Sequence, residues 1–203
     1  MSSCSSDDDD NSDNNAHDNG RAPKGVLAVD LGLPSGTKWA SCNVGATKPE
    51  EYGGYYAWGE TEEKEVYSET TYKYYQYGSW VNLGSNISGT EYDVAHVKWG
   101  GNWVMPTYDE QMELFDNCTS EWTTLNGVNG RKFTSNTNGN SIFLPAAGSR
   151  WNDDLEDAGK CSDYWSSVQS PYFAYGLSFD SGGIYWSDFN HSFGRSVRPV
   201  IKN

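Results

Sequence analysis

The sequence predicts an α+β domain in which many short strands accompany about two helices. Aromatic residues make up 15% of the chain, with nine Trp and fourteen Tyr, and Gly contributes 22 residues. This composition favours strands and turns over a helical bundle. Turn-forming stretches separate short strand-like segments in the second half of the chain, and the segment before them carries a helix-capping signal.

The first strands are expected near the start of the domain. "GVLAVDLGL" (25–33) and "TKWASCNVG" (37–45) have strand character and flank the turn-forming "PSG". "KPEEYGG" (48–54) is then expected to form one helical turn that starts at Pro49. "YYAWGE" (55–60) returns to strand character.

A long polar region follows. Residues 61–90 are rich in Tyr and typical of a loop, and "YKYYQYGSW" (72–80) is the part of it that most resembles a strand. "TEYDVAHVKWGG" (90–101) then predicts a short helix that ends at Gly100. Its inward side chains should be Val94, Ala95 and Val97.

The strongest helix signal is "PTYDEQMELFDNC" (106–118). Thr107 is the expected N-cap, and Glu110 three residues later completes a capping box. One apolar face is expected from Met112 and Phe115, with Leu114 beside it. After Thr119, "NGVNG", "NTNGN" and "DSGG" predict hairpin turns between short strands.

Size and charge exclude several classes of function. With 203 residues, the chain can form one domain with a sizeable core, or two very small ones. The formal net charge is −14, and both nucleic acids and anionic membrane surfaces would repel such a chain. No nucleic-acid partner is therefore expected. No run of about 18 apolar residues occurs that could span a bilayer.

The N-terminal residues differ from the rest in composition. Residues 1–20 contain six Asp and no Lys or Arg, with almost no apolar side chain to bury. Such a segment is predicted to stay disordered. We therefore expect an acidic tether over residues 1–24 and a single domain over residues 25–203.

The surroundings of Cys4 resemble the mature start of a bacterial lipoprotein. Small residues flank this Cys, and four consecutive Asp follow closely. An acidic run behind the lipidated Cys is similar to the signal that exports Bacteroidota lipoproteins to the outer face of the outer membrane. The resemblance implies lipidation at Cys4 and a lipid-anchored, cell-surface location in the outer membrane. The alternative is a flexible acidic leader in which the Cys has no role.

The remaining cysteines do not follow a metal-binding pattern. Cys42, Cys118 and Cys161 include no C-x-x-C pair, and the three His are scattered. At most one disulfide can form among them, and Cys42 with Cys118 is the pairing we favour. The triplet Trp151-Asn152-Asp153 has the letters of a lectin calcium motif but lacks its Pro-containing partner. An acidic loop is the simpler interpretation, so no metal and no other cofactor is expected.

A series of blocks resembles a known family. In chain order they are "VDLGLPSGTKWASCNVGA", "YYAWGET", "WGGNWVMPT", "NGVNGRKF", "NSIFLPAAG", "YWSS" and "GRSVRPV". Together they resemble the Fibrobacter succinogenes major paralogous domain, from about Ala28 to Val200, although Val104 stands where that family usually has Arg. The resemblance implies a C-type-lectin-like domain: two helices flanking a small, twisted, mostly antiparallel sheet, with long irregular loops.

An enzymatic role is not expected. Fold relatives that generate formylglycine depend on a cysteine pair, but neither Cys118 nor Cys161 has a matching motif around it. The carboxylate pairs Glu50–Glu51 and Asp153–Asp154 lie in polar segments and are typical of solvated surface. No nucleophile, base and orienting group can be assigned from the sequence.

The C-terminal stretch "IYWSDFNHSFGRSVRPV" (184–200) predicts a binding face. Fold relatives diversified by retroelements vary this surface, and aromatic side chains mixed with short polar ones are typical of antibody-like contact surfaces. Trp165 and Tyr175 should belong to the core, whereas Tyr185, Asp188, Asn190 and His191 should be exposed. The predicted ligand-binding residues are Tyr172, Phe173, Tyr175, Ser178, Asp180, Tyr185, Trp186, Asp188, Asn190 and His191.

Two functions follow from this pattern. The first is a surface-tethered module that binds an unidentified glycan or protein. The second is a structural component of a surface adhesin or pilus-like assembly, in which the domain only packs. The face rich in Tyr, Trp, Asn and Asp favours the first.

Overall fold

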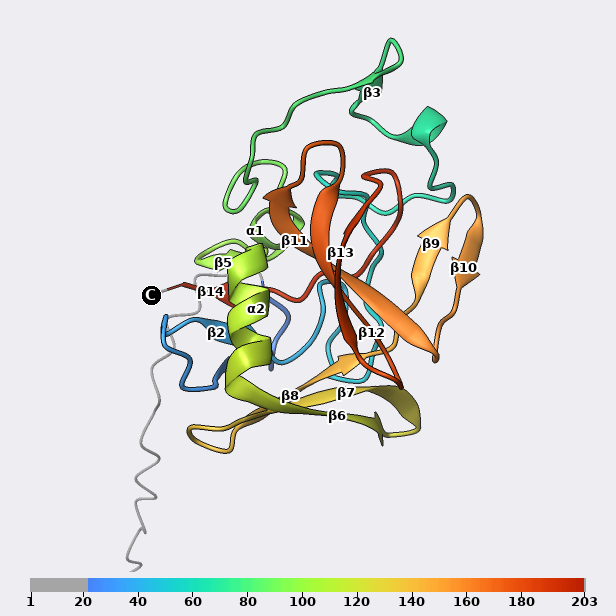
Figure 1. Ribbon diagram of the computed structural model, residues 1–203. Helices are drawn as coiled ribbons and strands as arrows, with labels where there is room; N and C mark the ends of the chain where they lie inside the picture. The colour runs from blue at the N-terminus through green and yellow to red at the C-terminus, as the bar shows by residue number, and fades with distance from the viewer. Residues whose placement is uncertain (1–21, 203) are drawn as a thin grey trace, which may run out of the picture.

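The computed structural model describes residues 22–202, and its architecture is mostly β (Figure 1). Of these described residues, 39% are in strands and 10% are in helices, and their strands form five small sheets. The predicted arrangement, a C-type-lectin-like α+β fold with two helices flanking one sheet, is therefore wrong. Frequent turns keep most strands short, so hairpins pair locally and the sheets stay separate.

A four-stranded sheet joins the two ends of the described chain. Its strands, in the order β1-β2-β14-β5, are Ala28–Asp30, Lys38–Ala40, Val200–Ile201 and Trp103–Val104. The first two confirm the predicted N-terminal strands, although they are shorter than expected. The "PSG" turn is present, where Gly36 N donates to Leu33 O at 2.9 Å.

The segment after this first hairpin agrees with its prediction only in part. Residues 48–51 form the single turn expected at Pro49, in which Glu51 N donates to Lys48 O at 3.2 Å. Residues 55–60, expected as a strand, contribute only a β-bridge between Tyr56 and Arg195. Between them the backbone packs closely: Gly53 has φ +73°, and a Cβ there would lie 2.4 Å from the Val44 carbonyl oxygen. This contact requires Gly and holds the chain in a left-handed conformation.

Two three-stranded antiparallel sheets contain the longest strands. One is β6-β7-β8, with bounds Cys118–Leu125, Val128–Ser135 and Ser141–Pro145. The other is β11-β12-β13, with bounds Cys161–Gln169, Ala174–Asp180 and Ile184–Phe189. The predicted hairpin turns at "NGVNG", "NTNGN" and "DSGG" are confirmed. Asn126 and Gly127 take positive φ values of 50° and 84°, as a two-residue hairpin turn requires.

Two further hairpins lie at the periphery (Figure 1). The pair β3 (Tyr75–Gln76) and β4 (Ser79–Trp80) confirms the strand character of residues 72–80 and follows a short 3₁₀-helix, Glu69–Thr71. The pair β9 (Ser149–Trp151) and β10 (Asp154–Glu156) contains the "WND" triplet at its turn. Asn152 there has φ +52°, and its backbone exchanges two hydrogen bonds with Tyr67. The triplet is therefore part of a tight hairpin.

The first helix, α1, spans Val94–Trp99. Asp93 caps it by accepting a hydrogen bond from His96 N at 3.0 Å, and Gly100 ends it as predicted. Val94 and Ala95 are buried as expected, but the third buried residue is Trp99, and Val97 is only half-buried.

The second helix, α2, spans Tyr108–Asn117 and confirms the capping box of Thr107 and Glu110. Its buried face is not the predicted one. Gln111 and Leu114 are buried, whereas Phe115 remains 40% exposed. The Gln111 amide donates to the backbone carbonyls of residues 164 and 165, which places a polar residue where an apolar one was expected.

A buried cation connects the segments of the core. Arg198 is 1% exposed, and its guanidinium donates to Asn43 Oδ1, Ala40 O and Phe143 O at 2.8, 3.0 and 2.8 Å. These acceptors lie on two separate segments, residues 40–43 and β8, so a planar donor group with a fixed geometry joins them.

The cysteines within residues 22–202 are all free thiols, so the predicted pairing of Cys42 with Cys118 is wrong. Cys42 is buried, and its Sγ donates to the Ala46 carbonyl at 3.3 Å. Burial raises the pKa of the Cys42 thiol and raises that of Cys118 to about 11. Both side chains act as small apolar groups of the core.

Candidate functional site

The predicted binding residues on the β12–β13 hairpin divide between two faces of the sheet. Tyr175 pairs with Asp188 and Leu177 with Trp186, whereas Ser178 pairs with Tyr185 on the opposite face. Directly paired residues share a face and neighbouring residues alternate. The expectation of one continuous face is therefore wrong, because strand alternation separates these side chains.

The face toward α2 forms an open aromatic cleft. Tyr108, the first residue of α2, lies 5.0 Å from Tyr175 and 5.4 Å from Trp186 between ring centroids. These three rings, together with Ser187 and Asp188, line a cavity of about 280 Å³, and we call this set the aromatic cleft. Trp186 also packs edge-on against Phe115, which explains why that ring points away from the core. Tyr175 is half-buried here rather than part of the core.

Asp188 is the acidic group of the aromatic cleft. It is exposed, and its Oδ2 accepts a hydrogen bond from Ser170 Oγ at 2.9 Å. Ser170 Oγ in turn accepts from the Phe173 amide at 3.2 Å. The carboxylate is thereby held by the β11–β12 connection, and its remaining oxygen can accept a hydrogen bond from a ligand.

On the opposite face of the hairpin, polar side chains stabilise the β12–β13 turn. Asp180 Oδ1 accepts from the amides of Gly182 and Gly183 at 2.7 and 2.9 Å, and Tyr185 Oη lies 3.4 Å from the same oxygen. Tyr185 is 50% exposed, as predicted. Asp180 is occupied by the turn, so this face offers fewer free polar groups than the aromatic cleft does.

The prediction that His191 is exposed is wrong. The side chain is 3% exposed and stacks on Trp58, with ring centroids 4.9 Å apart. Trp80 packs edge-on against it at 5.2 Å, and Tyr72 lies beyond at 6.2 Å. Desolvation lowers the pKa of His191 to about 4, and a hydrogen bond with the Phe173 backbone acts in the opposite direction.

Neighbouring Asn190 is half-buried and also has a structural role. Its Oδ1 accepts from the amide and the hydroxyl of Ser192 at 3.0 and 2.9 Å. Tyr172 and Phe173, by contrast, lie in the β11–β12 connection and are exposed, in agreement with the prediction.

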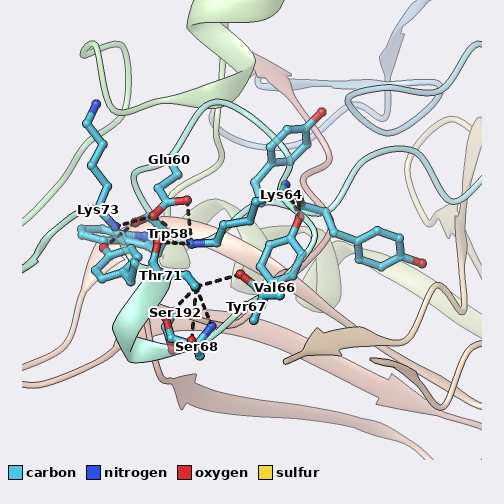
Figure 2. Close-up of polar contacts among 12 residues, drawn as sticks. Trp58, Glu60, Lys64, Val66, Tyr67, Ser68, Thr71, Lys73 and Ser192 are labelled. Carbon is cyan, nitrogen blue, oxygen red and sulfur yellow. Dashed lines mark hydrogen bonds and ion pairs between the residues drawn. The ribbon is translucent and has the colours of Figure 1, made fainter. Parts of the chain in front are cut away.

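The residues around His191 are ordered by a network that the sequence analysis missed. Figure 2 shows the Lys64 ammonium meeting the Glu60 carboxylate, and it also donates to the Thr71 carbonyl. Glu60 accepts from the Lys73 amide at 2.7 Å, and Tyr72 Oη donates to Trp58 O at 2.6 Å. The Tyr-rich segment is thus tied to the core, whereas its polar composition predicted a plain loop. No periodic signal could have found this network, because residues 60–64 form neither a helix nor a strand.

Tyr108 is the other residue that the sequence analysis missed. It directly follows the N-cap Thr107. Only the tertiary packing of α2 on β11 and β12, with Tyr108 against the Trp186 ring of β13, brings it to the hairpin (Figure 1).

Comparison with family models, with curated proteins and with solved structures finds no match for this chain. Two further findings concern the described part of the chain. Within residues 22–202, no group of three or more His, Cys, Asp or Glu is arranged to hold a metal ion. No helix among the same residues has the length and apolar character needed to cross a bilayer. The predicted lipidation site, Cys4, and nearly all of the predicted tether lie outside the described residues.

Proposed function

We propose that this chain is a cell-surface ligand-binding module and that the aromatic cleft is its binding site. The observation that carries the proposal is the convergence of Tyr108, Tyr175 and Trp186 around an open cavity, with the Asp188 carboxylate at its edge. Rings that served only to stabilise the fold would be covered. Here they line a cavity that opens to solvent.

The chemistry of the aromatic cleft favours a glycan. Tyr and Trp provide large, rigid surfaces that lose little conformational entropy on binding. The apolar face of a sugar ring can stack on them, while its hydroxyls donate to Asp188. A cavity with a few placed polar groups among rings is the usual form of a small-ligand site.

A protein ligand is the second candidate, supported by a different observation. β13 is the edge strand of the β11-β12-β13 sheet, and its outer N–H and C=O groups are not used by a further strand. An extended peptide could add to this edge by main-chain hydrogen bonding. A purely structural role in an adhesin or pilus-like assembly would not explain why the rings of the aromatic cleft line a cavity that is open to solvent.

The proposed cellular location follows from the N-terminal sequence. Lipidation at Cys4 would anchor the domain to the outer membrane, and the acidic tether would keep it at the cell surface. Membership of the Fibrobacter succinogenes major paralogous domain family is part of the same proposal and depends on the block order of the sequence. Fractionation of cells that produce the native protein, with and without Cys4→Ser, tests the anchor. An unmodified, soluble native protein would exclude it.

Binding at the aromatic cleft is tested on a glycan array with the full chain and two variants. Tyr108→Ala and Asp188→Asn should each weaken binding about tenfold or more, because central aromatic and charged contacts dominate interfaces. Trp151→Ala is the matched control, since that ring is exposed on the separate β9–β10 hairpin. If both cleft variants bind as tightly as Trp151→Ala, the aromatic cleft is not the site.

A further inference from the structure

A second cavity lies on the other side of the β11–β12 connection. It has a volume of about 260 Å³ and is built from the β3–β4 hairpin with the segment that follows it, and from the β11–β12 connection. Its lining residues are Ser79, Trp80, Asn82, Gln169, Pro171 and Tyr172. None of them belongs to the aromatic cleft, so the two cavities are distinct.

The Trp80 ring is held in a fixed position at this cavity. Its centroid lies 4.8 Å from that of Tyr75, 5.2 Å from that of His191 and 5.4 Å from that of Tyr72. Tyr72 is itself fixed by its hydrogen bond to Trp58 O. The buried cluster around His191 therefore supports Trp80 from behind, and a ligand would meet a ring whose orientation is already set. Such pre-organisation lowers the entropy lost on binding.

Tyr172, unlike Trp80, is not packed against a buried cluster. It is 74% exposed, so the fold gains little from its ring. The other polar residues that line the cavity are Ser79, Asn82 and Gln169, and Asn82 Oδ1 already accepts from the Gly84 amide at 2.8 Å. Amides and hydroxyls both donate and accept hydrogen bonds, as sugar hydroxyls do.

The cavity is also electrically neutral, which distinguishes it from the rest of the molecule. None of its six lining residues carries a charge, although the whole chain has a formal net charge of −14. A cationic ligand would find no partner in the cavity itself, and an anionic one would be repelled by the surrounding protein. An uncharged ligand is therefore the one that fits.

The same connection joins this cavity to the aromatic cleft. The second cavity is lined by Gln169, Pro171 and Tyr172. Ser170, which lies between them in the chain, donates a hydrogen bond to Asp188 of the aromatic cleft. Each cavity alone is slightly smaller than the range of about 300–1,000 Å³ typical of small-molecule sites, whereas the two together fall within it. A ligand with several linked rings could occupy both.

We propose that the Trp80–Tyr172 cavity is a second subsite for an uncharged oligosaccharide whose chain crosses the β11–β12 connection from the aromatic cleft. This inference rests on the proposed function, since the aromatic cleft supplies the first subsite. In the second, sugar rings stack on Trp80 and Tyr172 while Asn82 and Gln169 hydrogen-bond to hydroxyls. Affinity should rise with chain length, because each added contact is intramolecular once the first subsite is filled.

The test is an array of oligosaccharide ladders, from single rings to hexasaccharides, in neutral and in uronic-acid-containing series. For the unmodified full chain, affinity for neutral sugars should rise about tenfold or more from the shortest to the longest that bind. Tyr172→Ala and Gln169→Ala should each reduce this length-dependent gain but leave binding of short sugars unchanged. Melting temperatures should be unaffected by Tyr172→Ala, because its ring is exposed.

The variants separate the two proposals. Tyr108→Ala should weaken binding of short and long neutral sugars alike. If it weakens neither, the aromatic cleft is not the first subsite, and the proposed function fails together with the inference that rests on it. If the length-dependent gain persists in both Tyr172→Ala and Gln169→Ala, the second subsite is excluded. Binding only of acidic sugars, or no binding of the neutral ladder, would equally overturn it.

Discussion

At the scale of single residues, His191 shows how tertiary packing overrides a local pattern. In the sequence it stands among Asn, Ser and Phe and resembles a surface residue. In the structure, Trp58 and Trp80 enclose it, and Nε2 is buried without a hydrogen-bond partner among the described residues. No spacing rule could have identified this position, because its neighbours lie more than a hundred residues away in the chain.

This burial makes stability depend on pH. The pKa of His191 is lowered from 6.5 to about 4 in the folded protein, so the unfolded chain binds more protons between these values. Burial of the neutral His191 imidazole therefore makes its full contribution to the free energy of unfolding above about pH 6.5. This contribution is lost as the pH falls toward 4. The loss should be on the order of 3 kcal/mol, at about 1.4 kcal/mol per pKa unit.

Urea unfolding across this range measures the effect, with His191→Gln as the comparison. Carboxylates titrate near the lower end in both proteins, so the difference between the two curves isolates His191. The unmodified protein should lose more stability than His191→Gln between pH 6.5 and pH 4. Parallel curves would contradict the proposed burial of a neutral imidazole.

At the scale of elements, local signals predicted the hairpin turns and both helices. Gly and Asn at the turns and the capping box at Thr107 act within a few residues, so they can be recognised in the sequence. Which face of an element is buried depends on distant partners. Phe115 was expected inside, but the Trp186 ring offers it a contact at the surface while Gln111 reaches the β11 backbone.

The β12–β13 hairpin provides a direct test of strand alternation. Phe179 is fully buried, with its ring stacked near Tyr164, whereas Tyr185 is half-exposed on the neighbouring strand. Phe179→Ala should cost about 3–5 kcal/mol of unfolding free energy. Tyr185→Ala should change it by only about 0.5 kcal/mol. Chemical denaturation compares the two, and equal losses would mean that both faces of the hairpin are packed.

At the scale of the whole molecule, the sequence indicated many short strands, but the predicted α+β fold class was wrong and nothing indicated how the sheets assemble. β14 inserts between β2 and β5, which joins residues near both ends of the domain. Such pairings depend on long-range contacts that leave no local signal. The aromatic cleft has the same origin, since alternation and the position of α2 together select Tyr175, Trp186 and Asp188 from the predicted set.

The absence of a disulfide among residues 22–202 leads to a prediction for the whole domain. A disulfide across so long a loop would add roughly 2–4 kcal/mol, so a reductant would lower the melting temperature if one were present. The structure instead has three free thiols, and burial raises the pKa of Cys42, Cys118 and Cys161. Protonated thiols react slowly, because the thiolate is the nucleophile, and Cys42 and Cys118 are also buried.

Alkylation of a Cys4→Ser variant at pH 8 tests this in a single preparation. In the native state all three remaining thiols should react slowly, and in urea without reductant all three should react quickly. The melting temperature should be the same with and without dithiothreitol. If two thiols resisted alkylation in urea until a reductant was added, a disulfide would be present, and the core around Cys42 and Cys118 would differ from the one described.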